Sequence, residues 1–146
     1  ISDLYGMGNG RFDQMAKGLL MQFALYDWAD HLIEAYSHGM KQRLVIASAL
    51  LHEPSVIIVD EPMVGLDPAG IRMVKDLFRK QAAAGTTIFM STHTLEIAED
   101  LCDRIGVIHH GRLVAMGTTG DLRGTALIQE GDLEDVFLRL TGQEVP

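Results

Sequence analysis

The feature of this sequence that most restricts its fold is an apolar segment that ends in two adjacent carboxylates. Residues 56–59 read Val-Ile-Ile-Val, and Asp60, Glu61 and a proline follow directly. A short β-branched segment of this kind predicts a strand over residues 55–59 that is buried on both faces. The carboxyl edge of a parallel sheet is where α/β proteins place their ligands, so the two acids are candidate functional residues.

The rest of the chain predicts helices that alternate with strands. The expected helices cover residues 11–25, 28–34 (burying Trp28, Leu32 and Ile33), 37–52, 67–85, 94–101 and 132–140. A second buried strand is expected over 86–91, and 104–109 should pair with 112–116 as a hairpin around His110-Gly111. Residues 1–10 show no period and predict a loop. This alternation favours an α/β domain with a largely parallel sheet.

Charge and composition exclude several classes of protein. Twelve Lys and Arg against twenty Asp and Glu give a net charge of −8, which argues against nucleic-acid binding by bulk electrostatics. The longest apolar stretch, residues 44–51, is far shorter than the roughly 18 residues of a membrane span. Cys102 is the single cysteine, so the chain forms no internal disulfide and no cysteine metal cluster, and a reducing, cytosolic setting fits.

Three further motifs accompany the acidic pair. Tyr-Ser-His-Gly-Met at residues 36–40 opens a helix, and helix N-termini of this kind bind phosphate through free backbone N–H groups. Gly-Leu-Asp-Pro occupies 65–68, and Ser-Thr-His follows the next strand at 91–93. Each motif alone has a plainer interpretation: Ser37 and Asp67 as ordinary helix caps, the histidine as a surface residue, and the acids as solvated side chains.

In this order and at these spacings, the four motifs resemble the nucleotide-binding domain of the ABC transporters over nearly the whole chain. The resemblance implies an α/β, P-loop NTPase-like ABC ATPase domain that is incomplete, with a mostly parallel sheet flanked by helices. Residues 1–53 would be part of the helical subdomain with the signature motif and the following helix. Residues 54–124 would be the RecA-like core, and 125–146 a C-terminal strand and helix.

The resemblance also implies roles for single residues. Ser37 and Gly39 of the signature motif would contact the γ-phosphate of an ATP that the opposite subunit holds. Asp60 would position Mg²⁺, through water, as the Walker B aspartate. Glu61 would orient or deprotonate the attacking water as the catalytic glutamate.

Two further roles concern the dimer interface and the transition state. Asp67 falls on the loop that crosses that interface, and His93 matches the switch histidine that contacts the γ-phosphate. Tyr36, His38 and Met40 complete the signature but replace the Leu, Gly and Gln of the commonest family form. This variant is similar to the exporter-type branch of the family, and a side chain at position 38 must point away from the phosphates.

The glycine-rich loop G-x-x-x-x-G-K-[ST] that grips phosphate in this family is not found in the sequence. None of the four lysines follows a glycine, and residues 6–11 lack a lysine, a hydroxyl and a preceding buried strand. We therefore expect the chain to be the C-terminal portion of a longer ATPase. Alone, it should bind MgATP poorly.

The resemblance implies an ATP-hydrolysing subunit of an ABC transporter, with ATP and Mg²⁺ as cofactors. Two nucleotide-binding domains, as a homodimer or heterodimer, would close head to tail, and a separate polytopic membrane permease subunit would carry the substrate. The protein would be cytoplasmic and peripheral on the inner face of the cell membrane, with no nucleic-acid partner. Alternatives are a non-transport ABC ATPase of the DNA-repair or translation type, and a truncated, non-catalytic ABC protein.

Overall fold

The structure, a computed structural model, describes residues 9–128 and 131–142. The chain divides into two compact units, Ile1–Ser91 and Thr92–Pro146. Residues 1–8 of the predicted loop lie outside the described residues, and the prediction is wrong for Asn9 and Gly10, which begin the first helix. Within the described part, every helix is too short or too polar to span a bilayer.

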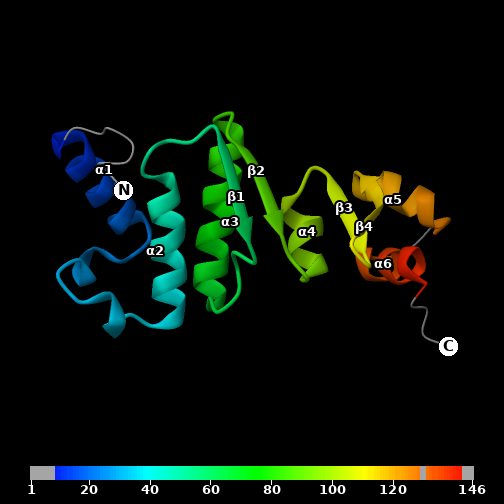
Figure 1. The fold of residues 1–146 in the computed structure, drawn as a ribbon, viewed down its shortest axis with the longest axis horizontal. Coiled ribbons are helices and arrows are strands. Elements are labelled where there is room, and N and C mark those ends of the chain that lie inside the picture. The colour runs from blue at the N-terminus through cyan, green and yellow to red at the C-terminus, as the bar shows by residue number, and fades with distance from the viewer. Residues whose placement is uncertain (1–8, 129–130, 143–146) are drawn as a thin grey trace. The chain divides into compact units, whose positions relative to one another are not determined.

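The first unit contains the elements up to the second strand (Figure 1). In chain order they are α1 (Asn9–Gln22), the 3₁₀ turns η2 (Tyr26–Trp28) and η3 (Ile33–Ala35), α2 (His38–Leu50), β1 (Val56–Asp60), α3 (Pro68–Ala83) and β2 (Thr87–Ser91). The predicted helices that begin near residues 11, 37 and 67 are confirmed. The α/β class is confirmed as well.

The helix predicted over residues 28–34 is wrong. Leu32 has an extended backbone, with φ −64° and ψ 139°, which separates two single 3₁₀ turns. Its side chain is 77% exposed, and Trp28 and Ile33 are exposed as well, so the predicted burial of these three residues is also wrong. The apolar spacing suggested a buried helical face, but these three side chains remain exposed among the described residues.

Strands β1 and β2 form a parallel pair, in register from Val56 opposite Thr87 to Asp60 opposite Ser91. Helix α3 lies beside the strands (Figure 1), and Ile57 of β1 is buried together with Val74, Leu77 and Phe78 of α3. The opposite face is open: Ile58 is 76% exposed and its cross-strand partner Phe89 is 64% exposed. The prediction that both strands are buried on both faces is therefore wrong, because the described residues cover only one face.

The described residues of the second unit form a hairpin and the helices α4 (Leu95–Leu101), α5 (Thr119–Ala126) and α6 (Leu133–Thr141). Strands β3 (Ile105–His109) and β4 (Arg112–Gly117) pair antiparallel, as predicted. His110 and Gly111 have φ of 46° and 73°, the left-handed pair that a type I′ turn requires. Helices α4 and α6 are confirmed, and α5 is an element that the sequence did not predict.

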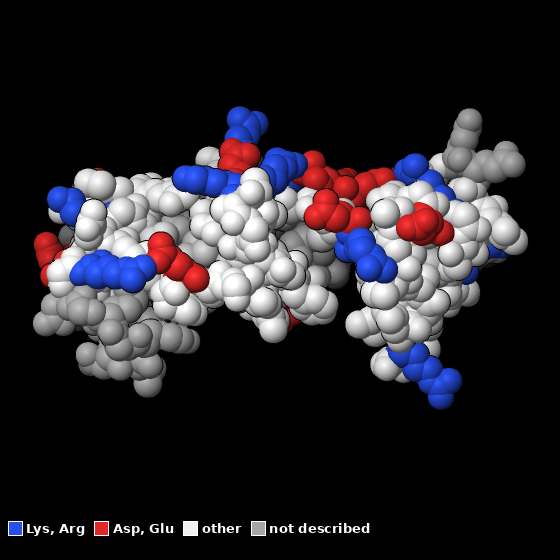
Figure 2. All heavy atoms as spheres, turned by 90° about the horizontal axis from the view of Figure 1, so that it is seen from above, with Lys and Arg blue, Asp and Glu red and all other residues white. Residues whose placement is uncertain are grey.

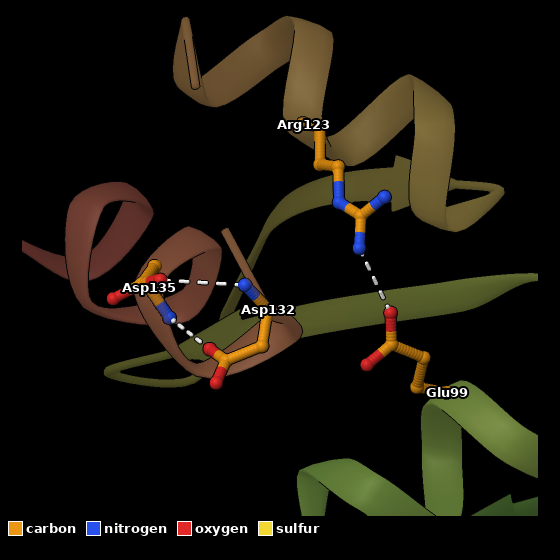
Figure 3. A network of polar contacts seen from close by, with 4 residues as sticks. All are labelled: Glu99, Arg123, Asp132 and Asp135. Atoms are coloured by element: carbon orange, nitrogen blue, oxygen red, sulfur yellow. Dashed lines mark hydrogen bonds and ion pairs between the residues drawn. The ribbon is translucent and has the colours of Figure 1, made fainter. Parts of the chain in front are cut away.

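The core of the second unit gathers buried side chains from α4, β3, α5 and α6: Ala98, Val107, Leu122, Ala126, Leu133 and Val136. Figure 3 shows the polar contacts around it. Arg123 of α5 donates to Glu99 of α4 over 3.1 Å, and Asp132 and Asp135 exchange bonds as the capping box of α6. Thr118 and Asp121 form a second capping box, on α5.

The charged side chains are mixed on the surface. Figure 2 shows Lys and Arg side chains interspersed with Asp and Glu on one face of the described residues. Ion pairs also form in the first unit, as between Arg11 and Glu53. Positive charge is therefore not gathered into a continuous area among the described residues of that face.

Candidate functional site

The two carboxylates lie where β1 and β2 end together. Asp60 is the last residue of β1 and lies opposite Ser91, the last residue of β2. The Ser91 hydroxyl donates to the Asp60 carboxylate, and the Glu61 N–H donates to the Ser91 carbonyl over 3.0 Å. Asp60 is exposed and Glu61 is half-buried. The acidic pair thus occupies the carboxyl edge of the sheet, where the strand pattern placed it.

The backbone of Glu61 is left-handed, with φ 45°. This conformation costs a residue other than glycine about 1–2 kcal/mol. The other described residues of this kind, Ala24, Glu53, His110 and Leu127, lie at helix ends or in the hairpin turn. Glu61 instead begins the turn after β1, where its carbonyl accepts from the Val64 N–H over 3.2 Å. Strain of this kind, held by its surroundings, gathers at functional sites.

The signature segment begins α2. Ser37 is the N-cap residue, and its Oγ accepts from the Met40 N–H over 3.2 Å. Tyr36 is only 6% exposed, and its hydroxyl donates to the Trp28 carbonyl over 2.7 Å. The Tyr36 side chain therefore anchors the segment from inside the unit. The N–H groups at the start of α2 remain suited to an anion.

The first turn of α2 lies directly against the turn that follows Glu61. A Cβ atom on Gly39 would lie 2.9 Å from the Gly65 carbonyl oxygen, and one on Gly65 would lie 2.1 Å from His38 Nδ1. Gly65 also has φ 77°, which favours glycine. Both glycines are thus needed for this close approach, and the His38 ring lies against Gly65.

Asp67 ends the same turn and caps α3. Its Oδ1 accepts from the Gly70 N–H over 2.8 Å, and Pro68 takes the first helical position. The capping role predicted for Asp67 is therefore confirmed. Its predicted place at a dimer interface stays a prediction.

His93 belongs to the second unit, two residues beyond the end of β2, and its side chain is exposed. The structure thus brings Ser37, Gly39, Glu61 and Asp67 into one region of the first unit. The approach of His93 to a bound phosphate stays a prediction.

Comparisons with known proteins agree with these motifs. Residues 5–64 match the family model described as ABC transporter. The chain is 42% identical over 122 residues to the daunorubicin/doxorubicin resistance ATP-binding protein DrrA of Streptomyces peucetius, covering 84% of this chain and 37% of the relative. A solved structure described as the ATP binding subunit of an ABC transporter matches with a TM-score of 0.88 and 34% identity, over 95% of this chain. Over the matched part, the chain is similar to the ATP-binding subunits of ABC transporters.

The chain spans only about half of the length of the proteins that it matches, and in some cases less. It covers 58% of the solved ATP-binding subunit. It covers 57% of the ABC-type transporter ATP-binding protein EcsA of Bacillus subtilis, to which it is 33% identical over 140 residues. The predicted resemblance to this family and the predicted fold are confirmed over this part.

The acidic pair fits the kind of Mg²⁺ site that a nucleotide completes. Among residues 9–128 and 131–142, no group of three or more His, Cys, Asp and Glu is placed to hold a metal. Nucleotide enzymes hold Mg²⁺ by one or two carboxylates, with water and phosphate oxygens as the other ligands. Asp60, at the strand end and next to Glu61, offers that number of carboxylates, but the described residues offer no all-protein cage.

Sequence reasoning missed two residues of the site, Gln42 and Gly65. The Gln42 amide nitrogen lies 3.4 Å from the carbonyl oxygens of Glu61 and Pro62. Gly65 belongs to the Gly-Leu-Asp-Pro motif, but the sequence carries no signal of its contact with His38. Gln42 follows His38 by four residues and so shares its helix face, which is the one signal that pointed to it.

Proposed function

We propose that this chain is part of an ATP-hydrolysing subunit of an ABC exporter, which drives transport through a separate membrane subunit. The observation that carries the proposal is the contact between two motifs of the first unit. The turn that begins with the left-handed Glu61 lies against the first turn of α2, where Ser37 and Gly39 are found. A candidate base and a candidate phosphate-binding segment are therefore held together by one fold.

In this proposal each residue has one task. Asp60 would hold Mg²⁺, which would neutralise the negative charge of the phosphates. Glu61 orients the attacking water and accepts its proton. Ser37 and Gly39 offer N–H groups and a hydroxyl to the γ-phosphate of a nucleotide on the partner subunit, and His93 contacts the same phosphate. Asp67 lies at the interface between the two subunits.

The phosphate-gripping loop would come from residues outside this sequence. The sequence contains no G-x-x-x-x-G-K-[ST], and the relatives are longer than the chain. Residues 1–53 would then belong to a helical subdomain, 54–124 to a RecA-like core and 125–146 to a C-terminal element. The two nucleotide-binding domains would form a dimer on the cytoplasmic side of the membrane, beside a polytopic permease.

The names of several relatives refer to drug resistance or export, which supports the exporter branch. Besides the resistance protein DrrA, a fluoroquinolones export ATP-binding protein of Mycobacterium tuberculosis is 40% identical over 105 residues. The signature form at residues 36–40 points the same way. We propose export as the direction of transport, with the cargo set by the membrane subunit.

The test uses the full-length gene product that carries this sequence, beside the 146-residue chain. Isothermal titration should show MgATP binding by the full-length product and little binding by the chain alone. Glu61→Gln should lower ATP hydrolysis by about 10²–10⁴-fold, as expected on loss of a general base, and should trap an ATP-bound dimer on gel filtration.

Glu134→Gln is the matched control, because it removes the same charge from an exposed position in the first turn of α6. It should hydrolyse ATP at the unmodified rate. Tight MgATP binding by the 146-residue chain, or normal hydrolysis by Glu61→Gln, would contradict the proposal.

A further inference from the structure

Gln42 connects the signature helix to the acidic turn. It lies one turn beyond His38 on α2 and is half-buried. Its Nε2 donates to the carbonyl oxygens of both Glu61 and Pro62, each over 3.4 Å. Since both neighbours are acceptors, only the amide nitrogen of this side chain can face them. The Gln42 amide group is thus shared between the carbonyl oxygens of two consecutive residues.

The Glu61 backbone is held from three directions. Its N–H donates to Ser91 at the end of β2, over 3.0 Å. Its carbonyl accepts from the Val64 N–H within the turn, over 3.2 Å, and from Gln42 on α2. A left-handed conformation in a residue other than glycine persists only where its surroundings fix it. Of these three partners, Gln42 alone belongs to a helix.

The direction of the Glu61 carboxylate depends on this backbone, because the backbone dihedral angles fix the Cα–Cβ bond. A small rotation of the peptide group between Glu61 and Pro62 would turn the Glu61 carboxylate away from the attacking water. Misplacement of a catalytic group by about 1 Å can cost 10²-fold in rate. A bond to that peptide group therefore bears directly on the chemistry proposed for Glu61.

We propose that Gln42 is a positioning residue that holds the peptide groups of Glu61 and Pro62 and so aims the Glu61 carboxylate. The inference rests on the proposed function of Glu61 as the base. Gln42 lies on α2, and Ser37 caps the same helix. A movement of the signature segment would therefore also move the bond to Glu61 of the same subunit.

The test replaces Gln42 by Glu in the full-length gene product. The side chain keeps its size, but a carboxylate oxygen replaces the donor and repels both carbonyls. We expect kcat for ATP hydrolysis to fall about 10- to 100-fold, with KM for MgATP within about twofold of the unmodified value, as loss of an interaction that acts only in the transition state requires. Gln14→Glu, at an exposed position of α1, is the matched control and should leave both constants unchanged.

A double-mutant cycle separates positioning from general damage. In a Glu61→Gln background, Gln42→Glu should cause no further loss, because the group that it aims is already gone. An equal loss in both backgrounds, or an unchanged kcat in the single variant, would overturn the proposal. Gln42→Ala replaces Gln42→Glu throughout if thermal unfolding shows that the charged variant does not fold.

Failure of the proposed function would look different. In that case Glu61→Gln alone would leave hydrolysis unchanged, or the full-length product would not hydrolyse ATP. Amide hydrogen exchange then decides whether Gln42 holds the turn. The Val64 amide, which donates to Glu61, should exchange at least several-fold faster in Gln42→Glu than in Gln14→Glu. Equal exchange would overturn the inference.

Discussion

The two units of the chain build their turns by opposite means. In the first unit, the turn after β1 holds Glu61 at φ 45° and Gly65 at φ 77°, and α2 lies so close that an added Cβ would collide. In the second unit, α5 and α6 each begin with a capping box, and a Cβ built on Gly111 would have open space among the described residues.

The difference separates a turn made by its own residues from one made by its neighbours. Capping boxes and type I′ turns satisfy their polar groups within a few residues, so they need no tertiary support. The turn at 61–65 breaks local preference at Glu61 and is held by β2 and α2. Backbone strain that neighbouring elements hold at the end of a strand supports a functional role for this turn.

The largest expected effect compares two glycines of similar φ. Gly65 has φ 77° and lies against His38, whereas Gly111 has φ 73° and open space. Gly65→Ala should lose about 2–4 kcal/mol of unfolding free energy, from left-handed strain plus overpacking. Gly111→Ala should lose about 1–2 kcal/mol, from strain alone. Urea unfolding of both variants measures the difference.

A second substitution tests the cause. In His38→Ala/Gly65→Ala the ring that meets the new methyl group is removed, so the loss should fall to that of Gly111→Ala. If the double variant is no more stable than Gly65→Ala, the contact with His38 does not explain the difference between the two turns.

A smaller effect is expected at the helix caps, where removal of a cap should lower the free energy of unfolding by a similar amount in both units. Ser37→Ala removes the cap of α2, and Thr118→Ala removes one half of the capping box of α5. Each should lose about 1 kcal/mol in urea unfolding. Only Ser37→Ala should also weaken nucleotide-driven dimerisation of the full-length product. Equal effects of both variants on dimerisation would count against the proposed role of Ser37.

The capping box of α5 should make the stability of the second unit sensitive to acid. The backbone N–H of Thr118, and then its hydroxyl, donate to Asp121 Oδ2 over 2.9 and 2.8 Å and lower the pKa of that carboxyl. Since the folded pKa lies below the unfolded value of about 4, the stabilisation is present above that value and is lost as the pH falls through the folded pKa.

Melting temperatures between pH 6 and pH 3 measure this loss. Asp121→Asn removes the titrating group and should flatten the acid part of the curve relative to the unmodified chain. Identical acid slopes for the two proteins would show that the bonds from Thr118 do not stabilise the charged carboxylate.

The smallest effect concerns Cys102, which follows α4 in the second unit. Burial, and to a lesser degree the charge of Asp103, raise the pKa of its thiol. Because the thiolate is the reactive form, alkylation by iodoacetamide at pH 8 should be several-fold slower in the folded chain than in urea. Cys102→Ala gives the background. Equal rates in both states would mean that the thiol is not shielded.

The sequence predicted those elements whose signals are local. The caps at Ser37 and Asp67 and the turn at His110-Gly111 could be predicted because each is formed by residues a few positions apart. Helix α5 was missed because its eight residues include two glycines and lack an apolar period. The Thr118–Asp121 spacing was its signal and was overlooked.

Burial and the site contacts could be predicted less well, because they depend on what lies across the fold. The strand pattern placed Asp60 and Glu61 at the carboxyl edge, and the structure has them there. It could not show that Ile58 is left open, that Glu61 is left-handed, or that Gln42 reaches its carbonyl. These features arise from approach between segments about twenty or more residues apart.

The packing around Tyr36 also gives the chain an optical property. Trp28 is its single tryptophan, so tryptophan emission arises from one place. The Tyr36 ring meets Trp28 edge-on at 5.9 Å, and the His31 ring lies 5.0 Å away. The emission of an indole depends on the groups that lie against it, and here these include the rings of Tyr36 and His31. The fluorescence of Trp28 therefore reports on the packing just before α2 without any added label.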